Sequence, residues 1–356
     1  MMSAVTQARF EQLARAYPVL PASARLKQTP EDFVVTEVLP FELSGNGEHV
    51  WLQVRKRNCN TDWLAGRIAA FAAVKRKAVG YAGLKDRNAV TTQWFSVHLP
   101  GQDDIDWAGF QLEDVGLLQI RRHQRKLQRG TLKHNAFVIR LRKIEFGVDG
   151  SIEAVDKRCD LIRQQGVPNY YGEQRFGRGL MNLIEAERMF AEPRRRLSRH
   201  KRSLYLSAAR SWMFNCMLSQ RVQAGTWNRR IDGDVFMLDG RSACFRDDGS
   251  ADLDERLQQG AIHPTAVLWG SGEAMARSQC AAIEAAVIER FPLFEQGLRD
   301  ARVAQQRRAL RVRVPDLSAR WEGVDLVLAF SLQAGSYATM VLREILALTE
   351  IQANAR

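Results

Sequence analysis

Hydrophobic and polar residues alternate along this chain in two different patterns. In the first 150 residues, apolar and polar positions alternate in several short runs that predict strands. From about residue 150 the apolar residues recur at longer, helical spacings, and strand-like runs return after residue 310. The pattern therefore predicts a β-rich first part, a helix-rich middle part and a β-rich last part.

The predicted elements follow from these spacings and from the turn residues between them. Helical spacing predicts helices over 5–17, 63–74, 152–164, 180–190, 204–223, 274–291 and 298–309, and a last helix that runs to Leu348. Alternating or β-branched runs predict strands over 48–54, 94–99, 138–142, 310–314 and 325–332.

Length and charge narrow the class of protein. The chain has 356 residues, which is room for two domains, and 46% hydrophobic residues, as in a soluble globular protein. It carries 52 Lys and Arg against 40 Asp and Glu, a net charge of +12. This excess favours a polyanionic partner, either nucleic acid or an anionic membrane surface. Because the chain shows no long basic amphipathic helix, we favour nucleic acid.

The N-terminal residues and the cysteines indicate a cytoplasmic protein. Residues 1–26 lack a continuous apolar segment, so they do not form a secretory signal, and no apolar run approaches the ~18–20 residues that span a membrane. The five Cys are scattered, which is typical of reduced thiols. The six His do not combine with them at zinc-ligand spacing, and no glycine-rich nucleotide loop is present. We therefore expect no metal and no cofactor.

One carboxylate stands out because it lies between cations. Asp86 is flanked by Lys85 and Arg87, after a turn at Gly83 and before a β-rich run that ends at Val97. The neighbouring cations favour the charged form of the carboxylate and suit a polyanionic substrate. A catalytic anion is one interpretation of this loop. A solvated turn is the other, and it is the more common role of such residues.

Two basic runs are candidate phosphate contacts. Residues 121–129 contain five Lys or Arg and one His, and a second cluster covers 194–202. Such runs are either solvated faces or contacts to an RNA backbone, and each phosphate contact would steepen the salt dependence of binding. The residues alone leave both roles open.

The loop around Asp86 matches a longer pattern. Gly83-Leu-Lys-Asp-Arg-Asn-Ala-Val-Thr-Thr-Gln-Trp resembles the Gly-x-Lys-Asp-x-x-Ala-x-Thr-x-Gln signature of the TruD family of tRNA pseudouridine synthases. Four further segments resemble TruD motifs in the same order: 27–33, 130–137, 166–177 and 333–340. The resemblance covers nearly the whole chain and is loosest over 225–300.

The resemblance implies a role for single residues. The Asp of the signature is the family's catalytic nucleophile, which corresponds to Asp86. Lys27 corresponds to a lysine near the active site, and Lys27 or Lys85 would keep Asp86 ionised.

Further residues correspond to the family's substrate contacts. Phe33 corresponds to a residue that touches the substrate, Asn135 to one that binds it, and Phe137 to one that stacks near the target base. A Phe that touches the substrate is replaced here by Tyr337, which keeps a stacking face and adds a hydroxyl.

The resemblance also implies a fold and an activity. The fold would be α+β, a pseudouridine synthase-like mixed, mainly antiparallel sheet with helices, plus an inserted α/β TRUD domain. The catalytic domain would cover 1–160, the insertion 161–310, and a return segment 311–356. The activity would be isomerisation of uridine 13 in the D arm of tRNA, a reaction without redox change that needs no cofactor and no metal. The family suggests a monomer with tRNA as its partner.

Two other classes of protein remain as alternatives. A non-catalytic RNA-binding protein could use the same basic cleft, and loss of Asp86 would distinguish it, but Asp86 is present. A metal-dependent nuclease would need clustered acidic ligands. The nearest acidic groups have the composition of ordinary polar loops: Asp103, Asp104, Asp106, Asp247 and Asp248.

Overall fold

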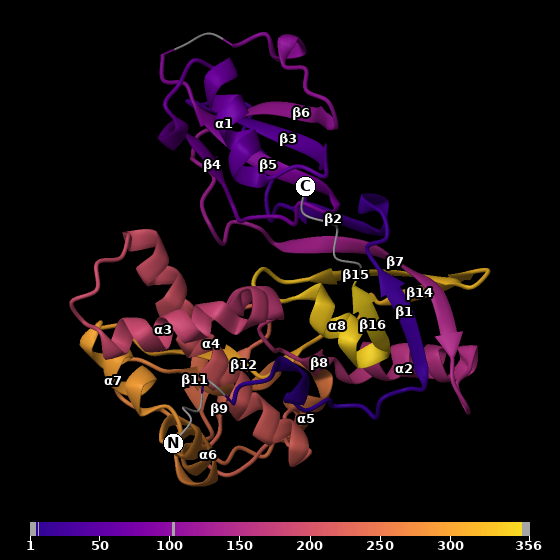
Figure 1. Ribbon diagram of the computed structural model, residues 1–356, viewed down its shortest axis with the longest axis vertical. Helices are drawn as coiled ribbons and strands as arrows, with labels where there is room; N and C mark the ends of the chain where they lie inside the picture. Colours follow the sequence, from indigo (N-terminus) through magenta and orange to yellow (C-terminus); the bar gives the residue numbers. More distant parts are fainter. Residues whose placement is uncertain (1–4, 6, 102–103, 351–356) are drawn as a thin grey trace. The chain divides into compact units, whose positions relative to one another are not determined.

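The computed structural model describes residue 5, residues 7–101 and residues 104–350. The chain forms two compact units. Unit 1 contains residues 1–19, 164–313 and 336–345, and unit 2 contains residues 20–163, 314–335 and 346–356. Each unit has its own sheet and its own helices (Figure 1).

Unit 2 is built on a ten-stranded sheet whose main path runs β14-β15-β7-β2-β5-β3-β6, with β1, β4 and β16 paired off this path. Among the described strands, β2–β5 and β1–β16 are the parallel pairs, and the remaining pairs are antiparallel. The predicted mixed, mainly antiparallel sheet is therefore confirmed. Its strands are β1 (Ala22–Leu26), β2 (Phe33–Val38), β3 (His49–Arg57), β4 (Val79–Tyr81), β5 (Val90–His98), β6 (Val115–His123), β7 (His134–Phe146), β14 (Ser318–Glu322), β15 (Asp325–Leu332) and β16 (Ala347–Glu350).

One helix of unit 2 packs on β3 and β5 because its apolar side chains recur on a single face. The helix α1 (Thr61–Phe71) begins after Asn60, whose side chain accepts the first free backbone N–H groups. Leu64 and Ile68 are fully buried in a cluster with apolar residues of β3 and β5 (Figure 1). Short 3-10 helices complete the unit: η2 (Pro30–Asp32), η3 (Arg76–Ala78) and η4 (Trp107–Gly109). The helix α2 (Ile152–Gln165) spans the boundary between the segments 20–163 and 164–313.

Unit 1 packs helices against a small antiparallel sheet of order β10-β9-β11-β12. Its core forms around the long helix α4, whose Trp212, Phe214 and Met217 are buried. The elements of this unit are α3 (Met181–Ala191), α4 (Arg199–Gln223), α5 (Leu253–Gln259), α6 (Ser278–Ile288), α7 (Pro292–Asp300), α8 (Ala338–Ile345), η1 (Phe10–Gln12), η5 (Glu173–Phe176), η6 (Arg178–Leu180), β8 (Val167–Pro168), β9 (Val235–Leu238), β10 (Cys244–Arg246), β11 (Ile262–Leu268), β12 (Gln306–Ala309) and β13 (Arg311–Val312).

The borders of the two units differ from the predicted domain boundaries near the chain ends. Residues 1–19 and 336–345 belong to unit 1, whereas the predicted boundaries place them in the catalytic domain. The segment 164–313 lies close to the predicted insertion, 161–310. The assignment of catalytic and insertion roles to these parts stays a prediction.

Two predicted helices are wrong. The segment 5–17 contains only η1 among its described residues, because the backbone N–H groups of Ala14 and Ala16 bond to the side chains of Ser219 and Glu344 at 2.9 and 3.0 Å. The predicted helix over 298–309 is interrupted, since α7 ends at Asp300 and residues 306–309 pair with β11 as β12.

Candidate active site

Asp86 lies in the loop that joins β4 to β5, and buried polar side chains hold this loop in place. The Nε2 atom of Gln93 donates to the carbonyl oxygen of Gly83 at 2.6 Å. The hydroxyl of Thr61 accepts the backbone N–H of Lys85 at 3.1 Å and donates to Gln93 Oε1 at 3.1 Å. Gln93 and Thr61 are both buried, so β5 and the first turn of α1 position the loop together.

The carboxylate of Asp86 contacts Lys27. Lys27 Nζ lies 3.0 Å from Asp86 Oδ2, and the two side chains are 11% and 27% exposed. The same ammonium group lies 4.4 Å from the centroid of the Phe33 ring, within the range of a cation–π contact. Lys27 has a φ of 57°, a backbone conformation that side-chain-bearing residues rarely adopt. The structure thus brings Lys27, Phe33 and Asp86 together, as the predicted site requires.

Lys85, the second lysine predicted to keep Asp86 ionised, forms a different ion pair. Its Nζ atom lies 2.7 Å from Glu37 Oε1, and the Glu37 side chain is fully buried. Glu37 Oε2 also accepts the backbone N–H of Trp94 at 2.8 Å. Burial raises the pKa of Glu37, and the nearby Lys85 opposes that rise. Of the two lysines, Lys27 therefore contacts Asp86, while Lys85 neutralises a buried carboxylate beneath the loop.

Phe33 and Phe137 lie on neighbouring strands with their rings in edge contact, 6.1 Å between centroids. Phe137 also stacks on Phe330 of β15, with 5.5 Å between centroids. The exposed fractions of Phe33 and Phe137 are 4% and 8%, so both rings pack as core side chains in this conformation. Their predicted role in binding the base stays a prediction.

Asn135 lies on β7 opposite Glu37 of β2, two residues before Phe137 on the same strand. Its Oδ1 atom is buried and accepts no hydrogen bond from the described residues. A buried amide oxygen with unused hydrogen-bonding capacity fits the predicted role of Asn135 in binding the substrate.

Tyr337 lies in unit 1, whereas the six other predicted site residues lie in unit 2. Its hydroxyl accepts a hydrogen bond from Arg175 Nε at 3.2 Å. A Cβ atom on Gly172 would lie 2.7 Å from Tyr337 Cδ1, so the glycine allows the ring to approach the backbone. Arg175 also donates to Ser207 Oγ at 3.0 Å. These contacts place Arg175 in a network within unit 1.

Several residues that shape the site have no role assigned from the sequence. Thr61, Gln93 and Glu37 hold the Asp86 loop, as described above. Lys56 is fully buried as well, and its Nζ atom donates to the carbonyl oxygen of Cys59 at 2.6 Å. Burial lowers the pKa of Lys56. One sequence feature could have indicated these residues: polar side chains such as Glu37, Lys56 and Gln93 interrupt otherwise apolar strands. Because an unpaired polar group inside a protein is costly, such residues are expected to have partners.

The acidic residues considered as nuclease ligands have other partners. Asp104 pairs with Arg122 at 2.7 Å, and Asp247 pairs with Arg230 at 2.6 Å. Asp106 and Asp248 accept backbone N–H groups in their own turns, and Asp103 lies outside the described residues. Across residues 7–101 and 104–350, no group of three or more His, Cys, Asp or Glu is placed to hold a metal ion.

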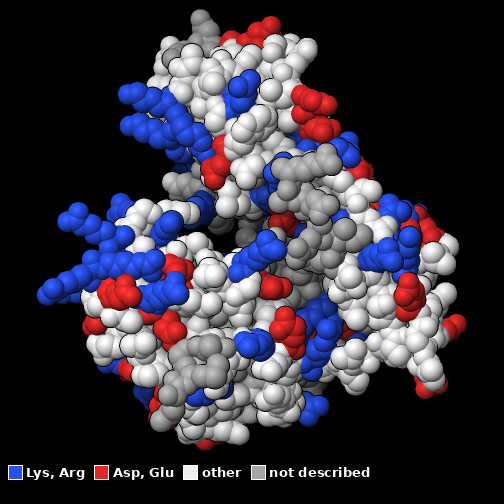
Figure 2. Space-filling view, viewed as in Figure 1, with Lys and Arg blue, Asp and Glu red and all other residues white. Residues whose placement is uncertain are grey.

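The two basic runs lie in different units. Residues 121–123 belong to β6 of unit 2, where the side chain of Arg122 pairs with Asp104. The second cluster, 194–202, covers the end of the segment between α3 and α4 and the first turn of α4, and Arg195 pairs there with Glu185 at 2.8 Å. Figure 2 shows Lys and Arg side chains gathered where α3 and α4 lie.

Comparison with known proteins identifies the family. A family model described as tRNA pseudouridine synthase D (TruD) matches residues 16–182 and 178–345. The protein named tRNA pseudouridine synthase D in Methylococcus capsulatus is 48% identical over 338 residues, which cover 94% of each chain. The protein of the same name in Hydrogenovibrio crunogenus is 45% identical over 335 residues, which cover 93% of this chain and 95% of that one.

A solved structure shows the same fold. It is titled a putative tRNA pseudouridine synthase D (TruD) from Methanosarcina mazei. Its TM-score is 0.71 at 23% identity, with 94% of this chain and 95% of that chain covered.

Fold and sequence matches together define a pseudouridine synthase-like enzyme of the isomerase class. The chain belongs to the tRNA pseudouridine synthase D (TruD) family. The predicted family, fold class and enzyme class are thereby confirmed. Among the described helices, none is long and apolar enough to cross a membrane.

Proposed function

We propose that this protein isomerises uridine 13 in the D arm of tRNA to pseudouridine, as a cytoplasmic monomer without a cofactor, with Asp86 as the nucleophile. Family membership supports the reaction and the tRNA substrate, because the similar proteins carry the name tRNA pseudouridine synthase D. The role of Asp86 is supported by one observation: its loop is held in place by hydrogen bonds, and its carboxylate lies 3.0 Å from Lys27 Nζ. The net charge of +12 suits a polyanionic substrate.

The reaction needs a nucleophile and a firm hold on the detached base. Two carbon atoms of the uridine, C1′ and C6, are open to attack by the Asp86 carboxylate. The N1–C1′ bond breaks, the uracil ring turns, a C5–C1′ bond forms, and the bond between the Asp86 carboxylate and the uridine carbon breaks, which frees Asp86. C5 then loses its proton and N1 gains one, so no atom or electron is added overall.

The other predicted site residues would bind the extruded base. Asn135 would read its polar edge, and Phe33, Phe137 and Tyr337 would contact its faces. Because Phe33 and Phe137 are nearly buried, their rings would have to part for a base to enter between them. In this proposal unit 2 supplies the nucleophile, and the segment 164–313 is the insertion that helps to hold the RNA.

The test is pseudouridine mapping on an unmodified tRNA transcript, incubated with wild-type protein or Asp86→Asn in the presence of EDTA. We expect wild type to convert uridine 13 and the variant to lose at least about 1,000-fold in rate, since an amide is not a nucleophile here. A transcript with cytidine at position 13 is the matched substrate control.

Each other outcome has a clear meaning. Equal conversion by Asp86→Asn would remove this residue from the mechanism. Conversion of a different uridine would retain the reaction class but reject position 13. Tight tRNA binding without conversion by wild type would favour a non-catalytic RNA-binding protein.

A further inference from the structure

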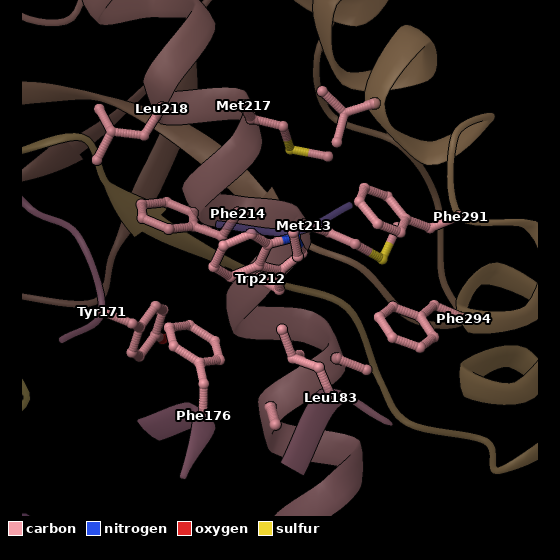
Figure 3. Close-up of a cluster of buried hydrophobic side chains, with 14 of the residues drawn as sticks. Tyr171, Phe176, Leu183, Trp212, Met213, Phe214, Met217, Leu218, Phe291 and Phe294 are labelled. Carbon is pink, nitrogen blue, oxygen red and sulfur yellow. The ribbon is translucent and has the colours of Figure 1, made fainter. Parts of the chain in front are cut away.

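A cavity of about 430 Å³ opens on unit 1 beside α4, at the ends of β11 and β12. None of its lining residues is a predicted site residue, although Tyr171 of the lining lies beside Tyr337, with 6.1 Å between the ring centroids. Its volume lies within the range of ~300–1,000 Å³ that is typical of small-molecule sites. Residues of the first half of α4 line this cavity, while the turns that follow carry the core side chains Trp212, Phe214 and Met217 (Figure 3).

Three arginines line the cavity, and no Asp or Glu does. Arg199 and Arg202 are exposed on the first turn of α4, and among the described residues neither pairs with a carboxylate. Arg210 is held by two backbone carbonyl groups, since its Nη2 atom donates to Leu268 at 2.8 Å and to Ala304 at 2.9 Å. Its Nε atom is buried and donates no hydrogen bond to any described residue. A positioned cation without a carboxylate partner is well suited to an anionic ligand.

The cavity also has an apolar wall. Leu206, Leu268 and Val303 line it, and all three pack against the core of unit 1. Tyr171 lines it too, but the guanidinium of Arg308 already lies over its ring, 4.1 Å from the centroid. A concave site that combines an apolar wall with several guanidinium groups matches a nucleoside phosphate better than it matches a flat membrane surface.

We propose that this cavity binds one nucleotide of the substrate RNA, with its phosphate on Arg199, Arg202 and Arg210 and its sugar and base against Leu206, Leu268 and Val303. The proposal rests on the proposed function, because it takes tRNA as the RNA. It gives unit 1 a defined RNA contact, in addition to the general attraction of a basic surface. A free nucleotide has the same phosphate, sugar and base, so the experiment must distinguish a nucleotide of tRNA from a free nucleotide as the ligand.

The experiment measures binding of an unmodified tRNA transcript over a range of salt concentrations. In the double variant Arg199→Ala/Arg202→Ala, we expect about tenfold weaker binding and a salt slope that is lower by about one or more. The matched control is Arg229→Ala/Arg241→Ala, which removes two exposed arginines of the same unit that do not line the cavity. The control should alter binding by less than about threefold.

A second variant separates the cavity from general electrostatics. Ser203 is exposed and lines the cavity, so Ser203→Trp would fill it without removing a charge. We expect this variant to weaken tRNA binding by about fivefold and to lower the salt slope as well, because the phosphate contact is lost with the nucleotide. Ser242→Trp, at an exposed position outside the cavity, is its control.

Steady-state conversion distinguishes this proposal from the proposed function. If wild type converts tRNA, the cavity variants should raise KM by about five- to tenfold and leave kcat within about twofold. If wild type converts no tRNA, the proposed function fails, and the binding data still judge the cavity. Unchanged tRNA binding by Ser203→Trp would overturn the proposal. The proposal would also be overturned if Ser203→Trp abolished binding of uridine 5′-monophosphate but left tRNA binding unaffected, because the cavity would then be a site for a free nucleotide.

Discussion

Two lysine–carboxylate pairs lie near one loop of unit 2, and they differ in burial. The Lys27–Asp86 pair is partly open to solvent, with 27% of the Asp86 side chain exposed. The Lys85–Glu37 pair is closed, because the Glu37 side chain is 0% exposed and Lys85 is 11% exposed. Asp86 and Lys85 are neighbours in sequence, yet their side chains belong to different pairs. The comparison separates a carboxylate that is open to solvent from one that is closed to it.

The difference has a physical basis. A buried charge is tolerated only when it is paired and hydrogen-bonded, and Glu37 has both Lys85 and the Trp94 backbone N–H. In the proposed reaction, Asp86 would give up part of its contact with Lys27, and water or substrate would replace that contact. We therefore expect damage to the closed pair to lower stability, and damage to the open pair to lower activity.

The largest expected effect follows from breaking the closed pair. Lys85→Met leaves Glu37 buried without its cation, which should cost about 3–5 kcal/mol of unfolding free energy. Urea denaturation at pH 7 measures this cost. Lys77→Met is the control, since Lys77 is an exposed lysine of the same unit and should change stability by less than about 0.5 kcal/mol. Equal stability of the two variants would contradict the supporting role of the pair.

The same variant has a predicted pH dependence. Burial raises the pKa of Glu37 above its ordinary value of 4.5, and Lys85→Met removes the cation that opposes this rise. The folded state then binds the proton more tightly than the unfolded state. The contribution of Glu37 to the unfolding free energy is therefore fully present below about pH 4.5 and is lost as the pH rises through the pKa of Glu37 in the folded state. The stability deficit of Lys85→Met should shrink from pH 7 towards pH 4.5, and a deficit that grows in acid would reject this explanation.

The next effect follows from breaking the open pair. Lys27→Met removes the ammonium group beside Asp86, so we expect kcat to fall by about 10- to 100-fold. The unfolding free energy should change by only about 1 kcal/mol, because the pair remains partly solvated. Single-turnover conversion of tRNA and urea denaturation measure the two quantities. Lys27→Arg keeps the charge and should recover part of the rate, whereas equal losses in both variants would assign Lys27 a purely steric role.

The smallest effect is expected in unit 1, where the interaction to be broken is a hydrogen bond to the neutral hydroxyl of Tyr337 and not an ion pair. Tyr337→Phe removes the acceptor of the Arg175 Nε hydrogen bond and leaves the ring in place. We expect conversion within about twofold of wild type and a stability loss of about 1 kcal/mol. Tyr337→Ala is the contrasting variant, since it removes the stacking face as well. A Tyr337→Phe variant as slow as Tyr337→Ala would give the hydroxyl a direct role in the reaction.

Local sequence patterns predicted the features that depend on neighbouring residues. Helical spacing predicted a helix over 63–74, and α1 covers Thr61–Phe71. The loop with Asp86 follows from a glycine and a run of small polar residues. A separate family motif over 27–33 supplied Lys27 and Phe33, and the structure places Lys27 beside both Phe33 and Asp86.

Features that depend on distant contacts were not predictable from those patterns. Lys85 reaches Glu37 because β2 and β5 are parallel neighbours in the sheet, and no local spacing shows that pairing. The predicted last helix ends at Ile345, before the predicted Leu348, because residues 347–350 pair with β1 as β16. In each case a tertiary hydrogen bond or strand pairing outweighed local propensity.

The division of the chain between the two units also determines when each can fold during synthesis. The chain crosses from one unit to the other five times, after residues 19, 163, 313, 335 and 345. Unit 1 needs α8, whose Glu344 bonds to the backbone of Ala16, and unit 2 needs β16 beside β1. At ribosomal rates of about 5–20 residues per second, residues 336–350 emerge roughly 20 to 70 seconds after the first. Both cores would stay incomplete for that time, so a nascent chain arrested earlier would expose unfinished cores of both units and offer a chaperone two binding regions.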